Sequence, residues 1–229
     1  MTSSDGSVRP GADPVRITLR PLGSAVPLGF FVFGTGMAVL GGIGLGWIPI
    51  PQVPQAGVLL LTFVAPLELI AAVFAFLSRD GLAGTGLGVF AGSWATVGVQ
   101  YLVGRPGSTS VVLGLYLLTF AAVVLLLGVI ATNGQLLLAV ILFVAAVRTL
   151  LAGLYELPAA TGLQTAAGTL SLAITVLAFY GAAALLLEDT AHRTVLPLGR
   201  RNQARTALDQ PLAQQTEQLE QEAGVRRNL

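Results

Sequence analysis

The sequence predicts an all-α polytopic membrane protein with six transmembrane helices, and three observations lead to that fold class. The 229-residue chain is 54% hydrophobic and only 10% charged, and its mean hydropathy is +0.80. A soluble domain of this size carries about 25% charged residues. The charges gather near the two ends of the chain, and the interior divides into apolar runs of about the 20 residues that span a bilayer.

Six apolar segments follow one another between short breaks of turn-forming residues. They cover residues 25–46, 56–77, 83–104, 111–131, 134–154 and 163–187. Because the connecting loops are short, neighbouring helices should run antiparallel in a compact bundle. The expected organisation is an N-terminal tail at 1–22, a six-helix membrane domain at 23–190 and a C-terminal tail at 191–229. The polar stretch at 1–20 has no apolar run, so no cleavable signal peptide is expected.

The placement of arginine predicts the orientation of the chain in the membrane. All twelve basic residues are arginine, and those outside the spans lie in the two tails and in the loop at Arg79, whereas the opposite loops hold only Arg105. Basic residues favour the cytoplasmic side. Both termini are therefore expected in the cytoplasm, with the protein in the plasma membrane (the inner membrane of a bacterium).

Small residues recur every four positions in the first and third helices. This small-xxx-small spacing places them on one side of a helix and lets two membrane helices approach closely. The two predicted stripes are Gly34, Ala38, Gly42 and Gly46, and Gly84, Gly88, Gly92 and Thr96.

A weak internal repeat relates the odd-numbered helices. Residues 31–41 align without gaps on 88–98, and a fainter copy occupies 141–146. The repeat indicates three helical hairpins around a protomer pore, with Phe33, Phe90 and Phe143 at a similar depth. Chance similarity among segments rich in Gly, Ala and Val is the alternative.

Four motifs carry a resemblance to a known family. The first helix opens with Ser-Ala-Val-Pro-Leu-Gly-Phe at 24–30 and continues with Val-Phe-Gly at 32–34. Phe-Ala-Gly-Ser-Trp follows at 90–94, Leu-Gly-Leu-Tyr-Leu at 113–117 and Arg-Thr-Val-Leu-Pro-Leu-Gly at 193–199. Over residues 20–200 the chain resembles the acetate uptake transporter family (acetate/succinate–proton), whose hallmark is Asn-Pro-Ala-Pro-Leu-Gly-Leu followed by Gly-Phe-Gly.

The chain also departs from that family's pattern. Ser24 and Ala25 replace the Asn and the first Pro of the hallmark. Glu68 stands where Gln is usual, and Arg148 where a small apolar residue is usual. These departures leave the identity of the substrate open.

The resemblance implies a homohexamer in which each protomer has its own narrow pore, pinched by a hydrophobic constriction that falls on Phe33, Phe90 and Phe143. The implied function is a membrane transporter or channel for small monocarboxylates such as acetate, with proton coupling left open. The expected partners are a small carboxylate, protons and the lipid bilayer. A ring of Phe side chains suits gating by dewetting.

Polar and small residues beside the constriction are candidates for the substrate path. The first turn after Pro27 has free backbone N–H groups and a positive dipole end, which favour anions. A hydroxyl in such a helix can bond a carboxylate or simply the preceding turn of its own helix. The candidate path residues are Pro27, Gly29, Gly34, Thr35, Ser93 and Trp94.

Glu68 and Arg148 are the ionisable residues well inside the expected spans. Such residues are costly in a membrane and mark functional sites. An ion pair between them is the first interpretation. A proton-carrying Glu68, or an Arg148 that attracts a carboxylate, are the alternatives.

Several function classes are disfavoured by composition. The chain has no cysteine and a single histidine, His192. No nucleophile–base constellation or metal-binding cluster is visible, so an enzyme, a metal site and a cofactor are not expected, and nothing indicates nucleic acid binding. A channel for small neutral solutes of the urea or amide type, or a non-transporting membrane protein such as a sensor, are the competing functions. Leu208, Leu212 and Leu219 suit either a short helix or a disordered tail.

Overall fold

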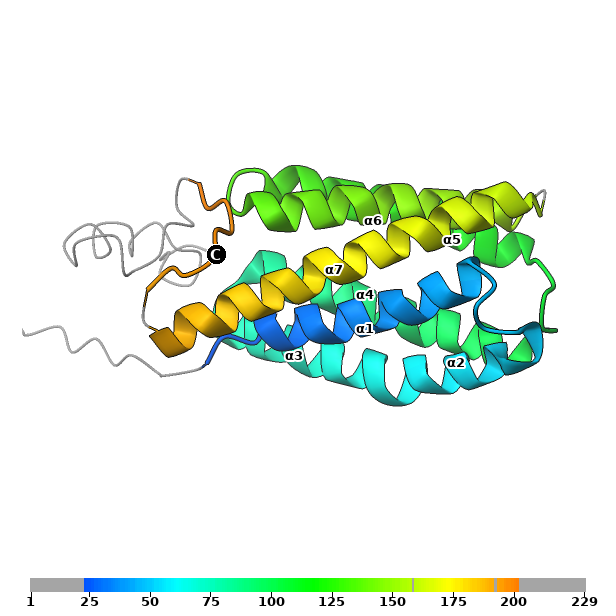
Figure 1. The fold of residues 1–229 in the computed structure, drawn as a ribbon, viewed down its shortest axis with the longest axis horizontal. Helices are drawn as coiled ribbons and strands as arrows, with labels where there is room; N and C mark the ends of the chain where they lie inside the picture. The colour runs from blue at the N-terminus through cyan, green and yellow to red at the C-terminus, as the bar shows by residue number, and fades with distance from the viewer. Residues whose placement is uncertain (1–22, 158, 192, 202–229) are drawn as a thin grey trace, which may run out of the picture.

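Six membrane-length helical segments run side by side along the long axis of the molecule (Figure 1). The computed structural model describes residues 23–157, 159–191 and 193–201. The predicted all-α fold with six spans is confirmed, since each segment is long and apolar enough to cross a membrane. The expectations for the tails at 1–22 and 202–229, and for His192, fall outside the described residues.

The second span is composite and the other five are single α-helices. The single helices are α1 (Val26–Gly44), α4 (Gly81–Val103), α5 (Val111–Ala131), α6 (Leu136–Tyr155) and α7 (Thr161–Ala191). The second span joins η1 (Ile50–Gln52), α2 (Val53–Leu59), η2 (Leu60–Val64) and α3 (Ala65–Leu77). The start of α1 and the end of α7 lie at the same end of the bundle, here called the near end (Figure 1). The opposite end is called the far end.

A π-helical turn interrupts the second span at η2. Pro66 follows at the start of α3, where it lacks an N–H and its ring crowds the carbonyl of Thr62, four residues earlier. A wider turn relieves that crowding, and single π-turns are common at functional sites. The first turn of α3 then carries Glu68, whose side chain is completely buried.

The most extensive helix contacts join α1 to α7, α5 to α6 and α3 to α4. The chain thus forms two sequential hairpins, and α1 and α7 bring its two ends together as the third pair. Glycines allow the backbones to meet between α1 and α7, between α5 and α6, and between α4 and α2, the other half of the composite second span. A Cβ on Gly168 would lie 2.9 Å from Gly44 Cα, one on Gly57 2.7 Å from Gly98 O, and one on Gly153 3.1 Å from Gly114 O.

The predicted glycine stripe of the first helix is only partly correct. Gly34 does face Phe179 and Ala178 of α7, but Gly42 faces Ile48, and Gly46 lies beyond α1 with φ +73° and no neighbour within 4 Å. Gly41 and Gly44 supply the remaining close contacts with α7. A strict four-residue repeat drifts by about 40° per step around a helix of 3.6 residues per turn, so it leaves the contact face.

The predicted stripe of the third helix also divides. A Cβ on Gly84 would lie 2.7 Å from Phe76, and one on Gly88 would lie 3.8 Å from Ala72. Gly92 has no neighbour within 4 Å, and Thr96 is exposed and bonds the carbonyl of Gly92. The second half of this stripe therefore faces away from the protomer.

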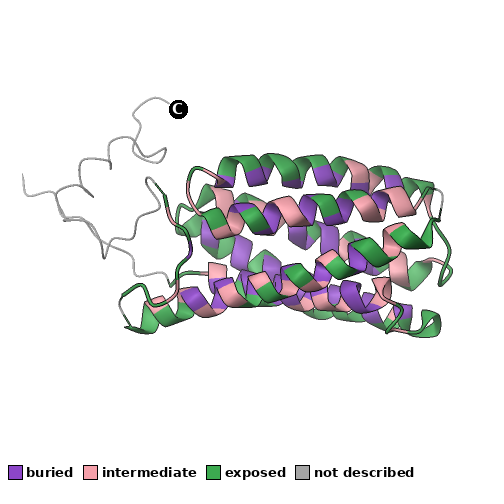
Figure 2. Ribbon diagram, turned by 45° about the horizontal axis from the view of Figure 1, so that its top comes forward, coloured by how far each residue is buried: buried purple, intermediate pink, exposed green. Residues whose placement is uncertain are grey.

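Burial follows the faces of the helices, with buried residues directed inward and exposed residues outward (Figure 2). Helix α5, which looks uniformly apolar in the sequence, buries Leu117, Val124 and Leu127 and exposes Leu125 and Leu126. An apolar exposed face suits contact with lipid tails.

The segment after α7 folds back onto the start of α6. Gly199 O accepts from Leu136 N at 3.1 Å, Leu198 O accepts from Leu137 N at 3.3 Å, and Arg201 N donates to Gly134 O at 2.7 Å. The first N–H groups of a helix lack internal partners, and Gln135 supplies no side-chain cap. The segment therefore caps α6.

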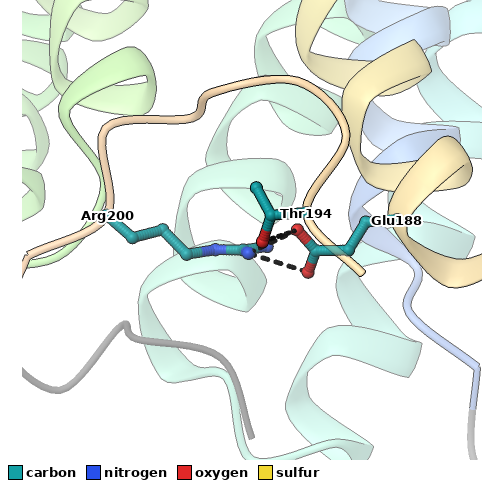
Figure 3. A network of polar contacts seen from close by, with 3 residues as sticks. All are labelled: Glu188, Thr194 and Arg200. Carbon is teal, nitrogen blue, oxygen red and sulfur yellow. Dashed lines mark hydrogen bonds and ion pairs between the residues drawn. The ribbon is translucent and has the colours of Figure 1, made fainter. Parts of the chain in front are cut away.

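An ion pair fixes this segment to α7 (Figure 3). Arg200 Nη1 lies 2.6 Å from Glu188 Oε2, and Thr194 Oγ1 donates to the same carboxylate at 3.3 Å. The family-like motif at 193–199 is thus a structural clamp between α6 and α7.

Replacing Gly168 by Ala tests the α1–α7 contact. The added methyl meets the backbone of Gly44, which cannot rotate away, so the free energy of unfolding should fall by about 1–3 kcal/mol as in other overpacked sites. The matched control is Gly162→Ala on the same helix, where nothing lies within 4 Å. That change should be neutral or stabilising by up to about 1 kcal/mol through helix propensity. Thermal unfolding in detergent measures both, and equal melting temperatures for the two variants would contradict the contact.

Candidate transport pathway

A cluster of aromatic rings lies at the centre of the bundle. The rings of Phe33 on α1 and Phe90 on α4 are 4.8 Å apart, and those of Phe90 and Phe120 on α5 are 5.3 Å apart. All three side chains are buried. Both pairs meet edge to face, an arrangement that aromatic rings favour. Helices α1, α4 and α5 therefore close the middle of the bundle with apolar rings.

Two further aromatic residues extend the cluster. Trp94 contacts Phe33 at 6.0 Å between ring centroids, and Tyr116 stacks on Phe120 at 5.9 Å. The indole of Trp94 also packs on Gly36, where a Cβ would lie 2.9 Å from the ring. Its buried Nε1–H has no hydrogen-bond partner in the described part of the chain.

A cavity of about 510 Å³ opens at the far end, and we call it the far cavity. It lies between the ends of α1, α4 and α6 and the beginning of α7. Its polar lining includes Gln100, Tyr101, Arg148, Glu156 and Gln164. Its size and polarity allow it to hold a small solute together with water.

Two smaller cavities lie deeper. The throat cavity, of about 20 Å³, is bordered by Ser93, Trp94, Phe120, Thr149 and several aliphatic side chains. The near cavity, of about 60 Å³, is lined by apolar residues of α1, α4, α5 and α6 and by Glu68. Arg148 borders both the far and the throat cavities, and Phe90 borders both the throat and the near cavities. The three cavities thus follow one another, with the aromatic cluster between the last two.

The structure brings Phe33 and Phe90 together but does not bring Phe143 to them. Phe143 is half-buried and packs on Gly128 of α5, where a Cβ would lie 3.2 Å from its ring. Phe120 supplies the third ring instead. Sequence reasoning missed Phe120 because it stands within the uniformly apolar α5, and only its distance of one helical turn from the motif at 113–117 could have drawn attention to it.

The predicted path residues divide between the cavities and the helix contacts. Gly29 lines the near cavity, and Ser93 and Trp94 border the throat cavity. Gly34 faces α7, and the Thr35 hydroxyl donates to the carbonyl of Phe31 in its own helix. Pro27 is buried in the first turn of α1 and is not among the residues that line these three cavities.

Glu68 presents a buried carboxyl group to the near cavity. Neither of its oxygens has a hydrogen-bond partner among the described residues. The indole Nε1–H of Trp94 is likewise buried without a hydrogen-bond partner among the described residues. Since an unsatisfied carboxylate in an apolar site is costly, this group favours a proton or an incoming donor.

The predicted ion pair between Glu68 and Arg148 does not form. Arg148 Nε donates to Ser171 Oγ at 2.9 Å, and Ser171 donates in turn to Ala167 O at 2.9 Å. The reason is the arrangement of the helices. Helix α3 packs on α4 and α1, whereas α6 packs on α5 and α7, so the two charges lie on opposite sides of the aromatic cluster.

Glu156 joins α6 to α5 at the rim of the far cavity. Its Oε2 accepts from the backbone N–H of Ser110 at 2.7 Å, and the residue is partly buried. Burial raises the pKa of Glu156, and the hydrogen bond from Ser110 offsets part of that shift. Within the described segments, no group of three acidic or His side chains is placed to hold a metal ion.

A bundle of six spans with cavities at both ends and an aromatic closure between them defines a membrane channel or transporter. A sequence model of the GPR1/FUN34/yaaH family matches residues 4–199, and the chain belongs to that family. The structure is similar to that of the bacterial acetate channel SatP, with a TM-score of 0.70 and 21% identity over 78% of this chain and 99% of that one. No curated protein sequence matches this chain significantly.

The raised pKa of Glu156 predicts how stability depends on pH. The folded state holds the proton of the Glu156 carboxyl more tightly than the unfolded state does. The contribution of this proton to the free energy of unfolding is therefore present below the unfolded pKa of about 4.3 and is lost as the pH rises through the pKa of the folded state. Glu156→Gln retains an acceptor for Ser110 and removes the buried charge. Its melting temperature should exceed that of the wild type at pH 7.5, and the difference should close as the pH falls to 4. A difference that is constant from pH 4 to 8 would contradict this account.

Proposed function

We propose that the chain forms a membrane pathway for small monocarboxylates such as acetate, one in each protomer. The observation that carries the proposal is the aromatic contact of Phe33, Phe90 and Phe120 between the throat and near cavities. Transport rather than catalysis is the activity that membership of the family and similarity to an acetate channel support.

The aromatic closure selects by size and polarity. Apolar rings exclude hydrated ions because no group replaces the lost water, and such closures gate by dewetting. A short monocarboxylate has a methyl end that can pass between rings. The neutral acid passes more easily than the anion, since burying an unpaired charge is costly.

We place the near end in the cytoplasm, on the basis of the arginine distribution, with the protein in the plasma membrane. We also propose a homohexamer. Its support within the chain is the outward stripe of Gly92 and Thr96 on α4. Among the described residues nothing lies within 4 Å of a Cβ on Gly92, and Thr96 is exposed, so this stripe suits close contact with another helix.

Uptake of radiolabelled acetate by proteoliposomes tests the function. Protein-dependent uptake above that of empty liposomes is expected for acetate, and no such uptake is expected for urea. Uptake of urea alone would favour a channel for neutral solutes, and uptake of neither would favour a non-transporting membrane protein.

Replacing Phe90 by Ala should open the closure, because this ring contacts both Phe33 and Phe120. Acetate uptake should rise, and butyrate, excluded by the wild type, should enter. Phe143→Ala is the matched control, because this ring packs on Gly128 and its loss should leave the selectivity of uptake unchanged. Altered selectivity in Phe143→Ala would show that Phe143 also belongs to the constriction. Unchanged selectivity in Phe90→Ala, with normal expression and particle size, would remove Phe90 from the pathway. Phe90→Leu serves as the milder variant if the cavity costs about 3–5 kcal/mol of stability.

We further propose that Glu68 carries the proton if uptake is coupled to protons. Glu68→Gln keeps the shape of the side chain and removes its ability to ionise. Stimulation of acetate uptake by a pH gradient should be lost in this variant, while exchange without a gradient should remain. Asp189→Asn, on an exposed position of α7, is the control. A full response to the gradient in Glu68→Gln would show that Glu68 carries no proton.

A further inference from the structure

Arg148 places a buried cation where the far cavity meets the throat cavity. The residue is 9% exposed and borders both cavities. Its Nε is held by Ser171, which is fully buried and is itself anchored to the backbone of Ala167. The guanidinium is therefore fixed in position from one side.

No acidic side chain in the described ranges forms an ion pair with Arg148. Glu156, the acidic residue that lines the far cavity, has one carboxylate oxygen engaged by the Ser110 N–H. A buried charge is retained in a membrane protein only when it is paired or has a function. The counterion of Arg148 is thus not supplied by this part of the chain.

The remaining donors of Arg148 reach the cavities. The Nη groups are bonded to no described residue, and they are not among the buried polar atoms left without a partner, so they are accessible. A guanidinium presents a planar fork of N–H groups that matches the two oxygens of a carboxylate. Arg148 therefore has the geometry to take an anion from the far cavity.

We propose that Arg148 binds the carboxylate of the substrate at the entrance to the throat, with Ser171 as its positioning residue. This inference rests on the proposed function and specifies how that function selects its substrate. The carboxylate lies on the guanidinium, and the apolar end enters the throat cavity beside Leu117 and Phe120. A cavity of about 20 Å³ holds roughly one water-sized group, so a tail of one methyl group fits and a longer tail does not.

Ligand-dependent thermal unfolding of the purified protein tests the site without requiring transport. The ligands are acetate, butyrate, acetamide and chloride. The variants are Arg148→Gln, Arg148→Lys and Ser171→Ala, with Arg79→Gln, on a loop at the near end, as the matched control. Acetate should raise the melting temperature of the wild type at lower concentrations than butyrate or chloride, and acetamide should have no effect.

Loss of the guanidinium should raise the acetate concentration that gives half of the maximal increase in melting temperature by about tenfold or more. This is the size expected for a hydrogen bond between charged groups. Arg148→Gln should show this loss, whereas Arg148→Lys and Ser171→Ala should lie between it and the wild type, and Arg79→Gln should match the wild type. Without ligand, Arg148→Gln should melt no lower than the wild type, because a buried unpaired charge has been removed. A purely structural role for Arg148 predicts a lower melting temperature instead.

The inference is overturned if Arg148→Gln keeps the acetate affinity of the wild type, or if chloride and acetamide act as strongly as acetate. If Arg148→Gln fails to fold, unchanged acetate affinity in both Arg148→Lys and Ser171→Ala overturns it as well. Acetate binding without acetate uptake in proteoliposomes would defeat the proposed function and leave this site in place. Acetate uptake together with unchanged acetate binding in the Arg148 variants would defeat this site and leave the proposed function in place.

Discussion

The bundle depends on the close approach of helix backbones at glycine. In a bilayer, no hydrophobic force draws helices together, so van der Waals contact between backbones has to do so. Gly44 meets Gly168, Gly57 of α2 meets Gly98, and Gly114 meets Gly153, and these contacts hold α1 to α7, the second span to α4, and α5 to α6. The pairs in turn set the positions of the aromatic rings, because Phe33, Phe90 and Phe120 come from one helix of each pair.

The ionisable residues divide the pathway into two chemically different halves. The far half is roomy and polar and carries the guanidinium of Arg148. The near half is narrow and apolar and carries the carboxyl of Glu68. Because the aromatic cluster separates the two groups, neither can neutralise the other, and each remains available to a solute or a proton. The two opposite charges within the membrane therefore form no bond with each other, and each lines a cavity of its own.

Hydropathy and loop chemistry predict the six spans, because length and apolarity alone decide whether a segment crosses a bilayer. The contacts between spans are harder to predict. Glycine occurs at so many positions of α1 that several stripes are possible, and only packing against α7 selects Gly41 and Gly44. The predicted ion pair between Glu68 and Arg148 is wrong because the sequence does not show which helices are neighbours, and α3 and α6 do not pack on each other. Phe120 was missed because one aromatic residue in a uniformly apolar helix has no distinguishing pattern.

The clamp after α7 has a consequence for biosynthesis. Helix α6 leaves the ribosome before the residues that satisfy its first N–H groups, Leu198 and Gly199, have been made. Those groups lie at the near end, where they must rely on water or lipid headgroups until α7 has been inserted and the chain has turned back. The last hairpin therefore matures only after synthesis has passed Arg200, whose pairing with Glu188 closes the structure. A chain that stops at the end of α7 would contain every span and still present an uncapped helix to the quality-control machinery of the cell.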